Sequence, residues 1–203
     1  IVKQVAQGAG LAVGKVETPQ GRPSPHVAQA NMTDAEFLTS LAGEVGFVLV
    51  VEDGNVNFHA PTDSAEAPAE GDLDAQDPLQ LVQGDNLLCF NATVTADAQV
   101  KEVTVRGWDI TQKKAVVATA PAESTSAEVG LKPSELAERF GNPTFVATDV
   151  PFGENEQVEA ASKALADQIA STHALIDGVA RGNPRLKAGK AVSLGLAGQP
   201  FEG

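Results

Sequence analysis

Hydrophobic and polar residues alternate in short runs along this chain, and the pattern is clearest between residues 87 and 120. In the first run, apolar side chains occupy every second position of residues 88–94, with polar residues mostly between them. Val103 and Val105 continue the apolar face on the next run, and a polar turn leads into a third run at 115–120. The pattern predicts neighbouring antiparallel strands of one sheet with an apolar face and a polar face.

A second pattern predicts a well-delimited helix from about residue 34 to residue 45. Thr33 suits the N-cap, Glu36 completes a capping box, and Gly46 suits the position that ends the helix. Met32 and Phe37 stand where a hydrophobic staple would place them. One apolar face then recurs at helical spacing: Phe37, Leu38, Leu41, Ala42 and Val45.

The rest of the first 60 residues supports a small α+β domain, which we place at residues 1–60. The expected elements are a helix at 1–7, strands at 11–16 and 26–30, and a hairpin of strands at 47–51 and 56–59. Asp53 and Gly54 suit a type I′ turn between the two hairpin strands. Residues 61–78 are rich in proline, alanine and acidic residues and are expected to form an acidic linker.

Beyond the sheet, helical patterns interrupt the chain at about 121–177. A short helix is expected at 134–140 and the longest helix at 155–176, with an extended segment at 144–149 between them. Strands are expected again at 179–181 and 191–196. We therefore expect residues 79–203 to form one domain with a helical insert.

Composition limits the classes of partner. The chain carries 14 basic and 27 acidic residues, a net charge of −13, which argues against binding to a nucleic-acid backbone. No run of about 18 apolar residues predicts a membrane span. Cys89 lies in a strand pattern and is expected to be a buried thiol. The chain starts without Met and opens directly on a helix, so we expect it to be a piece of a longer protein.

Candidate catalytic chemistry is sparse. His26, His59 and His173 are far apart in sequence, and neither a zinc-ligand spacing nor a nucleophile elbow accompanies them. With 27 acidic residues, a carboxylate pair for glycoside hydrolysis stays open, although the chain has few aromatic residues to line a sugar cleft. The sequence predicts no enzyme and no catalytic, cofactor-binding or metal-binding residue. Trp108, the one tryptophan, is expected to anchor the sheet, with a ligand platform as the alternative.

Three ordered motifs resemble the family of phage late control D and VgrG-type proteins. The first is the helix and hairpin segment from Thr33 to Phe58, and the second is the run from Gln99 to Lys114, with Val-Arg-Gly-Trp-Asp at 105–109. The third is Gly-Asn-Pro-Arg-Leu-Lys-Ala-Gly at 182–189, followed by Phe-Glu-Gly at 201–203. Together the motifs are spread over most of residues 31–203.

The resemblance implies the fold and role of a baseplate hub, which joins a tail tube to its spike in contractile phage tails, type VI secretion or related injection particles. It implies an antiparallel, tube-like β-barrel, incomplete in this chain, with α/β insert domains. It also implies a homotrimer that contacts a tail-tube (Hcp-like) protein and spike proteins. Such a hub is assembled in the bacterial cytoplasm and located at the tail baseplate. A carbohydrate-binding or cell-wall-processing module is the alternative function.

Overall fold

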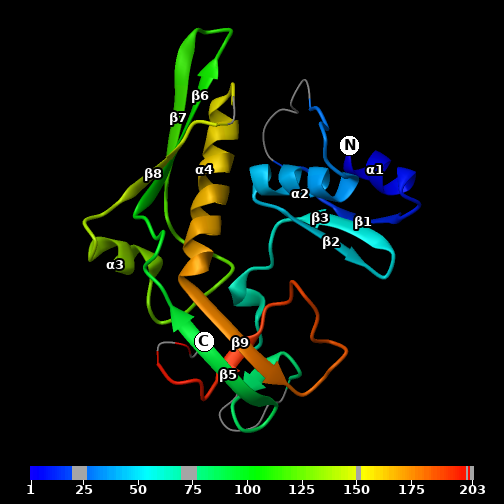
Figure 1. Ribbon diagram of the computed structural model, residues 1–203, viewed down its shortest axis with the longest axis vertical. Coiled ribbons are helices and arrows are strands. Elements are labelled where there is room, and N and C mark those ends of the chain that lie inside the picture. Colours follow the sequence, from blue (N-terminus) through cyan, green and yellow to red (C-terminus); the bar gives the residue numbers. More distant parts are fainter. Residues whose placement is uncertain (20–26, 70–76, 150–151, 200, 202–203) are drawn as a thin grey trace. The chain divides into compact units, whose positions relative to one another are not determined.

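The computed structural model describes residues 1–19, 27–69, 77–149, 152–199 and 201 (Figure 1). The described residues form a mixed α+β structure with four small sheets. The chain divides into two compact units. The first consists of Ile1–Pro61, Val103–Ala120 and Phe145–Leu165, and the second of Thr62–Glu102, Pro121–Thr144 and Ala166–Gly203.

The first unit begins with a three-stranded sheet and two helices. Its elements are α1 (Val2–Gly8), β1 (Ala12–Val16), α2 (Asp34–Val45), β2 (Val48–Glu52) and β3 (Asn55–His59). The strand order is β1-β3-β2, with β1 parallel to β3 and β2 antiparallel to it. Val56 and Phe58 of β3 are buried, and the rings of Phe47 and Phe58 meet edge to face at 5.4 Å.

The N-terminal cap of α2 has the predicted geometry. The Thr33 hydroxyl accepts a hydrogen bond from the Glu36 amide at 3.3 Å, and the Glu36 carboxylate accepts one from the Thr33 amide at 2.8 Å. The Thr33 hydroxyl also donates to the Glu36 carboxylate at 2.8 Å. The bonds that the carboxylate accepts, first from the Thr33 amide and then from its hydroxyl, hold the pKa of Glu36 below its ordinary value. Gly46 ends the helix with φ of 70°. Phe37 and Leu38 are buried, whereas Met32 is exposed.

The hairpin prediction is confirmed, and one strand prediction is wrong. Asp53 and Gly54 have φ of 49° and 76°, the left-handed geometry that a type I′ turn requires. Residues 27–30 of the strand expected at 26–30 have no regular structure and pair with no strand. The Gln29 side chain donates to the Met32 carbonyl and the Asp34 carboxylate, beside the start of α2. His26 lies outside the described residues.

The first unit also contains most of a second three-stranded sheet and most of the longest helix. Their elements are β6 (Glu102–Asp109), β7 (Lys114–Pro121), β8 (Thr144–Ala147) and α4 (Asn155–Ala170). The strand order is β7-β6-β8, and α4 runs alongside this sheet in Figure 1. Val103, Val105 and Val116 are buried on the sheet, and Val158 is buried on the helix. The predicted strands at 103–109 and 115–120 are thus confirmed.

The second unit contains two two-stranded sheets and short helical segments. Its elements are η1 (Ser64–Glu66), β4 (Gln80–Val82), β5 (Leu87–Val94), α3 (Pro133–Glu138), η2 (Ser171–His173), β9 (Ala174–Ala180) and β10 (Ser193–Gly195). Strands β4 and β10 pair in parallel, and β5 and β9 pair antiparallel. The 134–140 helix prediction is confirmed as α3, and the extended segment as β8.

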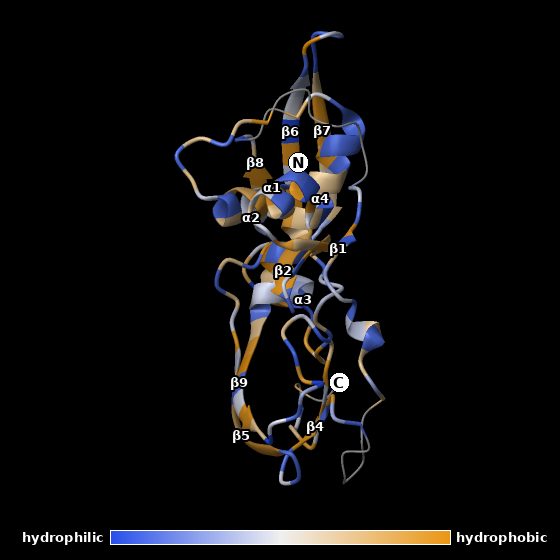
Figure 2. Ribbon diagram, turned by 90° about the vertical axis from the view of Figure 1, so that its right-hand side faces the viewer, coloured by the Kyte–Doolittle hydropathy of each residue, from blue (hydrophilic) through white to orange (hydrophobic). Residues whose placement is uncertain are grey.

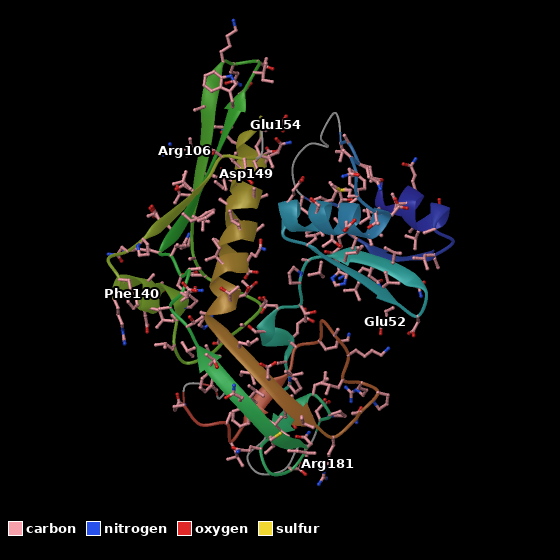
Figure 3. All side chains as sticks on the ribbon, viewed as in Figure 1. Glu52, Arg106, Phe140, Asp149, Glu154 and Arg181 are labelled. Atoms are coloured by element: carbon pink, nitrogen blue, oxygen red, sulfur yellow. The ribbon has the colours of Figure 1, made fainter. Side chains whose placement is uncertain are left out.

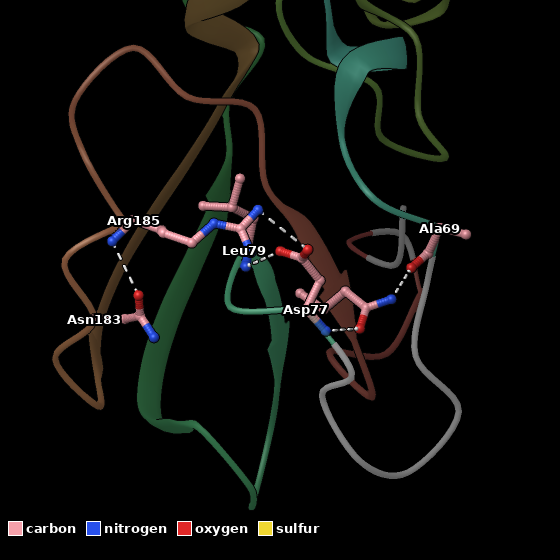
Figure 4. A network of polar contacts seen from close by, with 6 residues as sticks. Ala69, Asp77, Leu79, Asn183 and Arg185 are labelled. Atoms are coloured by element: carbon pink, nitrogen blue, oxygen red, sulfur yellow. Dashed lines mark hydrogen bonds and ion pairs between the residues drawn. The ribbon is translucent and has the colours of Figure 1, made fainter.

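A polar network joins the start of β4 to the loop that precedes β10 (Figure 4). The Asp77 carboxylate accepts a hydrogen bond from the Leu79 amide at 2.9 Å and lies 3.3 Å from the Arg185 guanidinium. The Arg185 amide donates to the Asn183 side chain at 2.9 Å, which fixes the Gly-Asn-Pro turn. The Gln80 side chain accepts from the Asp77 amide and donates to the Ala69 carbonyl. The third sequence motif therefore has a structural role in this unit.

The prediction that the strands of residues 87–120 belong to one sheet is wrong. Strand β5 pairs with β9, whereas β6 and β7 pair with each other and with β8. Two of the pairings, β1 with β3 and β4 with β10, are parallel. Within the described residues the strands form no closed barrel, and the resemblance implied a barrel that is incomplete in this chain. Alternation along a strand predicts its faces but not its neighbours, since any strand with an open edge offers the same backbone groups.

The helix predicted at 155–176 is too long. It ends at Ala170, and η2 then leads directly into β9, which contains Ile176. The hydroxyls of Ser171 and Thr172 donate to the carbonyls of Gln168 and Ile169 at 3.0 and 2.7 Å. Side chains that bond to backbone carbonyls in this way compete with continuation of a helix. The strand expected at 179–181 is the end of β9, and the strand expected at 191–196 is the shorter β10.

Candidate interaction surfaces

The β6–β7 hairpin has one buried face and one open face. The hydroxyls of Thr104 and Thr119 lie 2.9 Å apart on the open face. Because antiparallel partners keep a constant sum of residue numbers, this pair places Arg106 opposite Val117 and Trp108 opposite Ala115. The four side chains therefore lie on the same open face as the two threonines. Figure 3 shows Arg106 extending from β6.

Three apolar side chains on or beside this face are exposed. Trp108 is 54% exposed and Val117 51% exposed, and Ile110 in the turn beyond them is 81% exposed. Exposed apolar residues gathered on one element make this hairpin a candidate interaction surface. The sequence predicts that Trp108 anchors the sheet, and because more than half of its side chain is exposed, any such anchoring is at the rim and not in the core.

Local contacts hold the hairpin in one shape. The Asp109 carboxylate accepts hydrogen bonds from the amides of Thr111 and Gln112 at 2.8 and 2.9 Å, which closes the turn. The Trp108 amide donates to the Phe152 carbonyl at 2.9 Å. A Cβ on Gly107 would lie 2.1 Å from the same carbonyl, so the backbones approach closely there. The indole ring is exposed while its backbone is fixed.

The second unit has a different open surface on the β5–β9 ribbon, defined here as strands β5 and β9. Cys89 pairs with Val179 and Thr93 with Leu175, so these four side chains share a face. Leu175 is 62% exposed and Val179 55% exposed, and Cys89 is exposed as well. Figure 2 shows hydrophobic colouring along β5. Within the described residues, no third strand pairs with either edge of the ribbon.

The exposed position of Cys89 contradicts the expected buried thiol. A register shift between Leu87 and Cys89 buries Leu87 and leaves Cys89 on the outer face, one residue before half-buried Phe90. The sequence placed Cys89 in a strand, but a bulge changes which residues of a strand face the core.

His173 is buried at the end of η2 and lines a cavity of about 260 Å³ in the second unit. Its Nδ1 lies 2.8 Å from the Ala170 carbonyl, so this nitrogen donates and Nε2 is left as an acceptor. Ser64, Glu123 and Lys132 are among the other lining residues. The described contacts of His173 include none to a serine hydroxyl, as a nucleophile–base pair requires.

His59 belongs to a separate set of contacts. His59 lies on β3 in the first unit, where its Nδ1 contacts the Ala60 carbonyl at 2.6 Å. Among the described residues, no three His, Cys, Asp or Glu side chains are grouped as metal ligands would be. None of the described helices has the length and hydropathy of a transmembrane segment. Within the described residues, the candidate interaction surfaces are therefore the open face of the β6–β7 hairpin and the outer face of the β5–β9 ribbon.

Comparison with known sequences decides the family. The sequence model of the Alg8 N-terminal domain family matches residues 1–203. The chain belongs to this family. Comparison of the chain with curated protein sequences gives no match.

Two solved structures share the fold of this chain. The crystal structure of the 43 kDa tail protein of prophage MuSo2 from Shewanella oneidensis matches 95% of the chain with a TM-score of 0.58 and 15% identity. A tail protein from Neisseria meningitidis MC58 matches 89% of the chain with a TM-score of 0.51 and 14% identity. The chain spans about half of each protein, 54% and 52%. At these identities the likeness shows a shared fold.

Proposed function

We propose that this chain is a structural component of a contractile tail or a related injection particle, and that it belongs to the hub connecting the tail tube to the spike. The observation that carries the proposal is the fold shared with a prophage tail protein over 95% of the chain. The three ordered sequence motifs of late control D and VgrG-type proteins support the same role. The proposal covers phage, prophage and type VI-like particles alike.

A homotrimer in contact with a tail-tube (Hcp-like) protein and spike proteins is the proposed assembly. Its support is the open face of the β6–β7 hairpin and the unpaired edges of the β5–β9 ribbon, since exposed sheet edges and apolar faces suit protein partners. We propose a location at the tail baseplate after assembly in the bacterial cytoplasm. The role is non-enzymatic and needs no cofactor.

The proposed domain division follows the sequence expectation. A small α+β insert occupies residues 1–60, an acidic linker occupies 61–78, and a barrel-related domain occupies 79–203 with its helical insert at about 121–177. The barrel of such a hub would be completed by strands that pair with the open edges of β5 and β9.

The exposed ring of Trp108 is the observation that favours a carbohydrate-binding or cell-wall-processing module as the second candidate. Aromatic faces commonly stack on sugars, and Trp108 is more than half exposed. Isothermal titration calorimetry of the protein with soluble peptidoglycan fragments separates the candidates. Saturable binding that the Trp108→Ala variant weakens would favour the module.

Deletion of the gene in its source organism tests the hub proposal. We expect electron micrographs of the deletion strain to lack complete contractile particles, and the wild-type gene to restore them. A matched complementation with the Phe58→Ala variant, which should fold poorly, ought to restore fewer particles. Complete particles with spikes in the deletion strain would contradict the proposal that this chain is a hub component.

A further inference from the structure

We propose that the cavity lined by His173 binds a small organic cation, a molecule that carries an amine or guanidinium group. The cavity has a volume of about 260 Å³ and lies within the second unit. The proposal goes beyond the tail role, because it assigns a ligand site that a structural component does not require. It can therefore be tested on the purified chain, separately from particle assembly.

Backbone hydrogen bonds fix the wall of this cavity. The wall consists of Ser64 of η1, the segment 123–132 with the first residues of α3, and His173 of η2. The Ser64 amide donates to the Thr125 carbonyl at 2.8 Å, and the Thr125 amide donates to the Asp167 carboxylate of α4 at 2.8 Å. Because these bonds already connect the segments, little ordering is required when a ligand binds.

His173 supplies a buried hydrogen-bond acceptor to the wall. The residue is 1% exposed, and its Nδ1 lies 2.8 Å from the Ala170 carbonyl. A carbonyl only accepts, so Nδ1 donates and Nε2 of the neutral ring is an acceptor. Nε2 has no hydrogen-bond partner among the described residues. Since an unpaired buried polar atom is unfavourable, a donor that enters the cavity beside this ring gains by pairing with Nε2.

The charged side chains of the wall set the sign of the ligand. They are the carboxylates of Glu123 and Glu128 and the ammonium of Lys132, two negative charges against one positive. Ionised carboxylates only accept hydrogen bonds, as does Nε2 of His173. The wall therefore favours a positively charged ligand with several N–H donors, because such hydrogen bonds are strengthened by charge. An amine or a guanidinium meets both conditions.

The apolar part of the wall suits a short alkyl chain beside the charged group. It is formed by Ala127, Val129, Leu131 and Pro133. A neutral sugar fits less well, since the described lining residues include neither a phenylalanine nor a tryptophan face on which a sugar ring could stack. An anion would be repelled by the two carboxylates.

Isothermal titration calorimetry of the chain with 1,4-diaminobutane and with agmatine tests the proposal. We expect saturable one-to-one binding, which the double variant Glu123→Gln with Glu128→Gln should weaken by about tenfold or more. Lys132→Gln should strengthen binding a few-fold, because it removes the repelling ammonium. The blocked amino acid Nα-acetyl-lysine amide distinguishes a free amine from the lysine side chain of a protein partner, and binding of either supports the site.

Non-specific attraction of cations to an acidic chain requires a matched control. Glu156→Gln with Glu159→Gln makes the same charge change at exposed positions of α4 in the first unit. This control should bind like wild type. Equal weakening in both double variants, or preferential binding of succinate, would overturn the proposal, and so would the absence of saturable binding.

Nitrogen-15 NMR of the histidine rings locates the ligand. The Nε2 resonance of His173 should move as the diamine is added, because this atom gains a donor. The resonances of His59, which lies on β3 in the first unit, should stay in place. Saturable binding that leaves the His173 resonance unchanged would put the ligand elsewhere and overturn the proposal.

Discussion

The β1-β3-β2 sheet and the β5–β9 ribbon both use strands of ordinary length, but they bury their apolar side chains to different degrees. In the sheet, Val56 and Phe58 are buried, and Phe37 and Leu38 are buried on α2 in the same unit. In the ribbon, Leu175 and Val179 remain more than half exposed on one face. A two-stranded ribbon with open edges has little stability of its own in water. The β1-β3-β2 sheet is therefore stabilised by its own buried side chains, whereas the β5–β9 ribbon depends for its stability on contacts with other parts of the protein or with partners.

The largest expected effect comes from a substitution in the core of the β1-β3-β2 sheet. Phe58→Ala should lower the free energy of unfolding by about 3–5 kcal/mol, because it leaves a cavity among buried side chains. Leu175→Ala in the ribbon should change it by no more than about 0.5 kcal/mol, since that side chain is mostly exposed. Urea unfolding followed by far-ultraviolet circular dichroism compares the two. Equal losses would contradict the contrast between sheet and ribbon.

A pair of glycines tests how closely the first unit is packed. Gly46 has φ of 70°, and a Cβ there would lie 2.6 Å from the Ala164 Cβ, so Gly46→Ala should cost roughly 1–3 kcal/mol. Gly43, in the same helix, has open space around it. Gly43→Ala should therefore stabilise the protein by about 0.5–1 kcal/mol. Opposite signs in thermal unfolding are the expected result, and a loss in both variants would count against the described packing.

The α2 cap tests a smaller contribution to the same unit. Thr33→Ala removes the hydroxyl that accepts from the Glu36 amide, and we expect a loss of about 1 kcal/mol in urea unfolding. Thr33→Ser keeps the hydroxyl and should stay close to wild type. Similar losses in both variants would mean that the methyl group, rather than the cap, matters.

Substitution of Glu36, the acidic residue of the capping box, should have the smallest effect on stability, and this effect should depend on pH. The hydrogen bonds from Thr33 lower the folded-state pKa of Glu36 below its ordinary value of 4.5. The ionised form therefore favours the folded state, and this stability is complete above the ordinary pKa and lost as pH falls through the folded-state pKa. The difference in Tm between wild type and Glu36→Gln should be largest near neutral pH and shrink on acidification. A difference that grows in acid would contradict the cap.

The contrast between the two regions also explains what the sequence could predict. The α2 helix and the 53–54 turn follow from contacts within a few residues, so Thr33, Glu36, Asp53 and Gly54 predicted them correctly. The pairing of β5 with β9 joins residues 80 to 93 positions apart, and nothing local indicates it. The predicted end of the long helix was wrong because the local pattern is ambiguous: Ile176 fits the apolar face of a helix as well as it fits a strand.

The open surfaces were harder to predict than the elements that carry them. Val117 and Trp108 belong to correctly predicted strands, yet alternation alone does not say whether an apolar residue has a covering partner. The sequence did carry one signal, the apolar residues on both faces of β7, where Val116 is buried and Val117 is exposed. The bulge before Cys89 left no such signal, because bulges depend on the pairing partner.

The central claim is that this chain is a structural part of a tail particle, and its copy number in purified particles tests that claim most directly. Quantitative mass spectrometry of particles from the source organism should find the chain co-purifying at a fixed ratio to the tail-tube protein, at about three copies per particle for a closed trimeric hub. Particles that lack the chain, or a ratio that varies between preparations, would contradict the account.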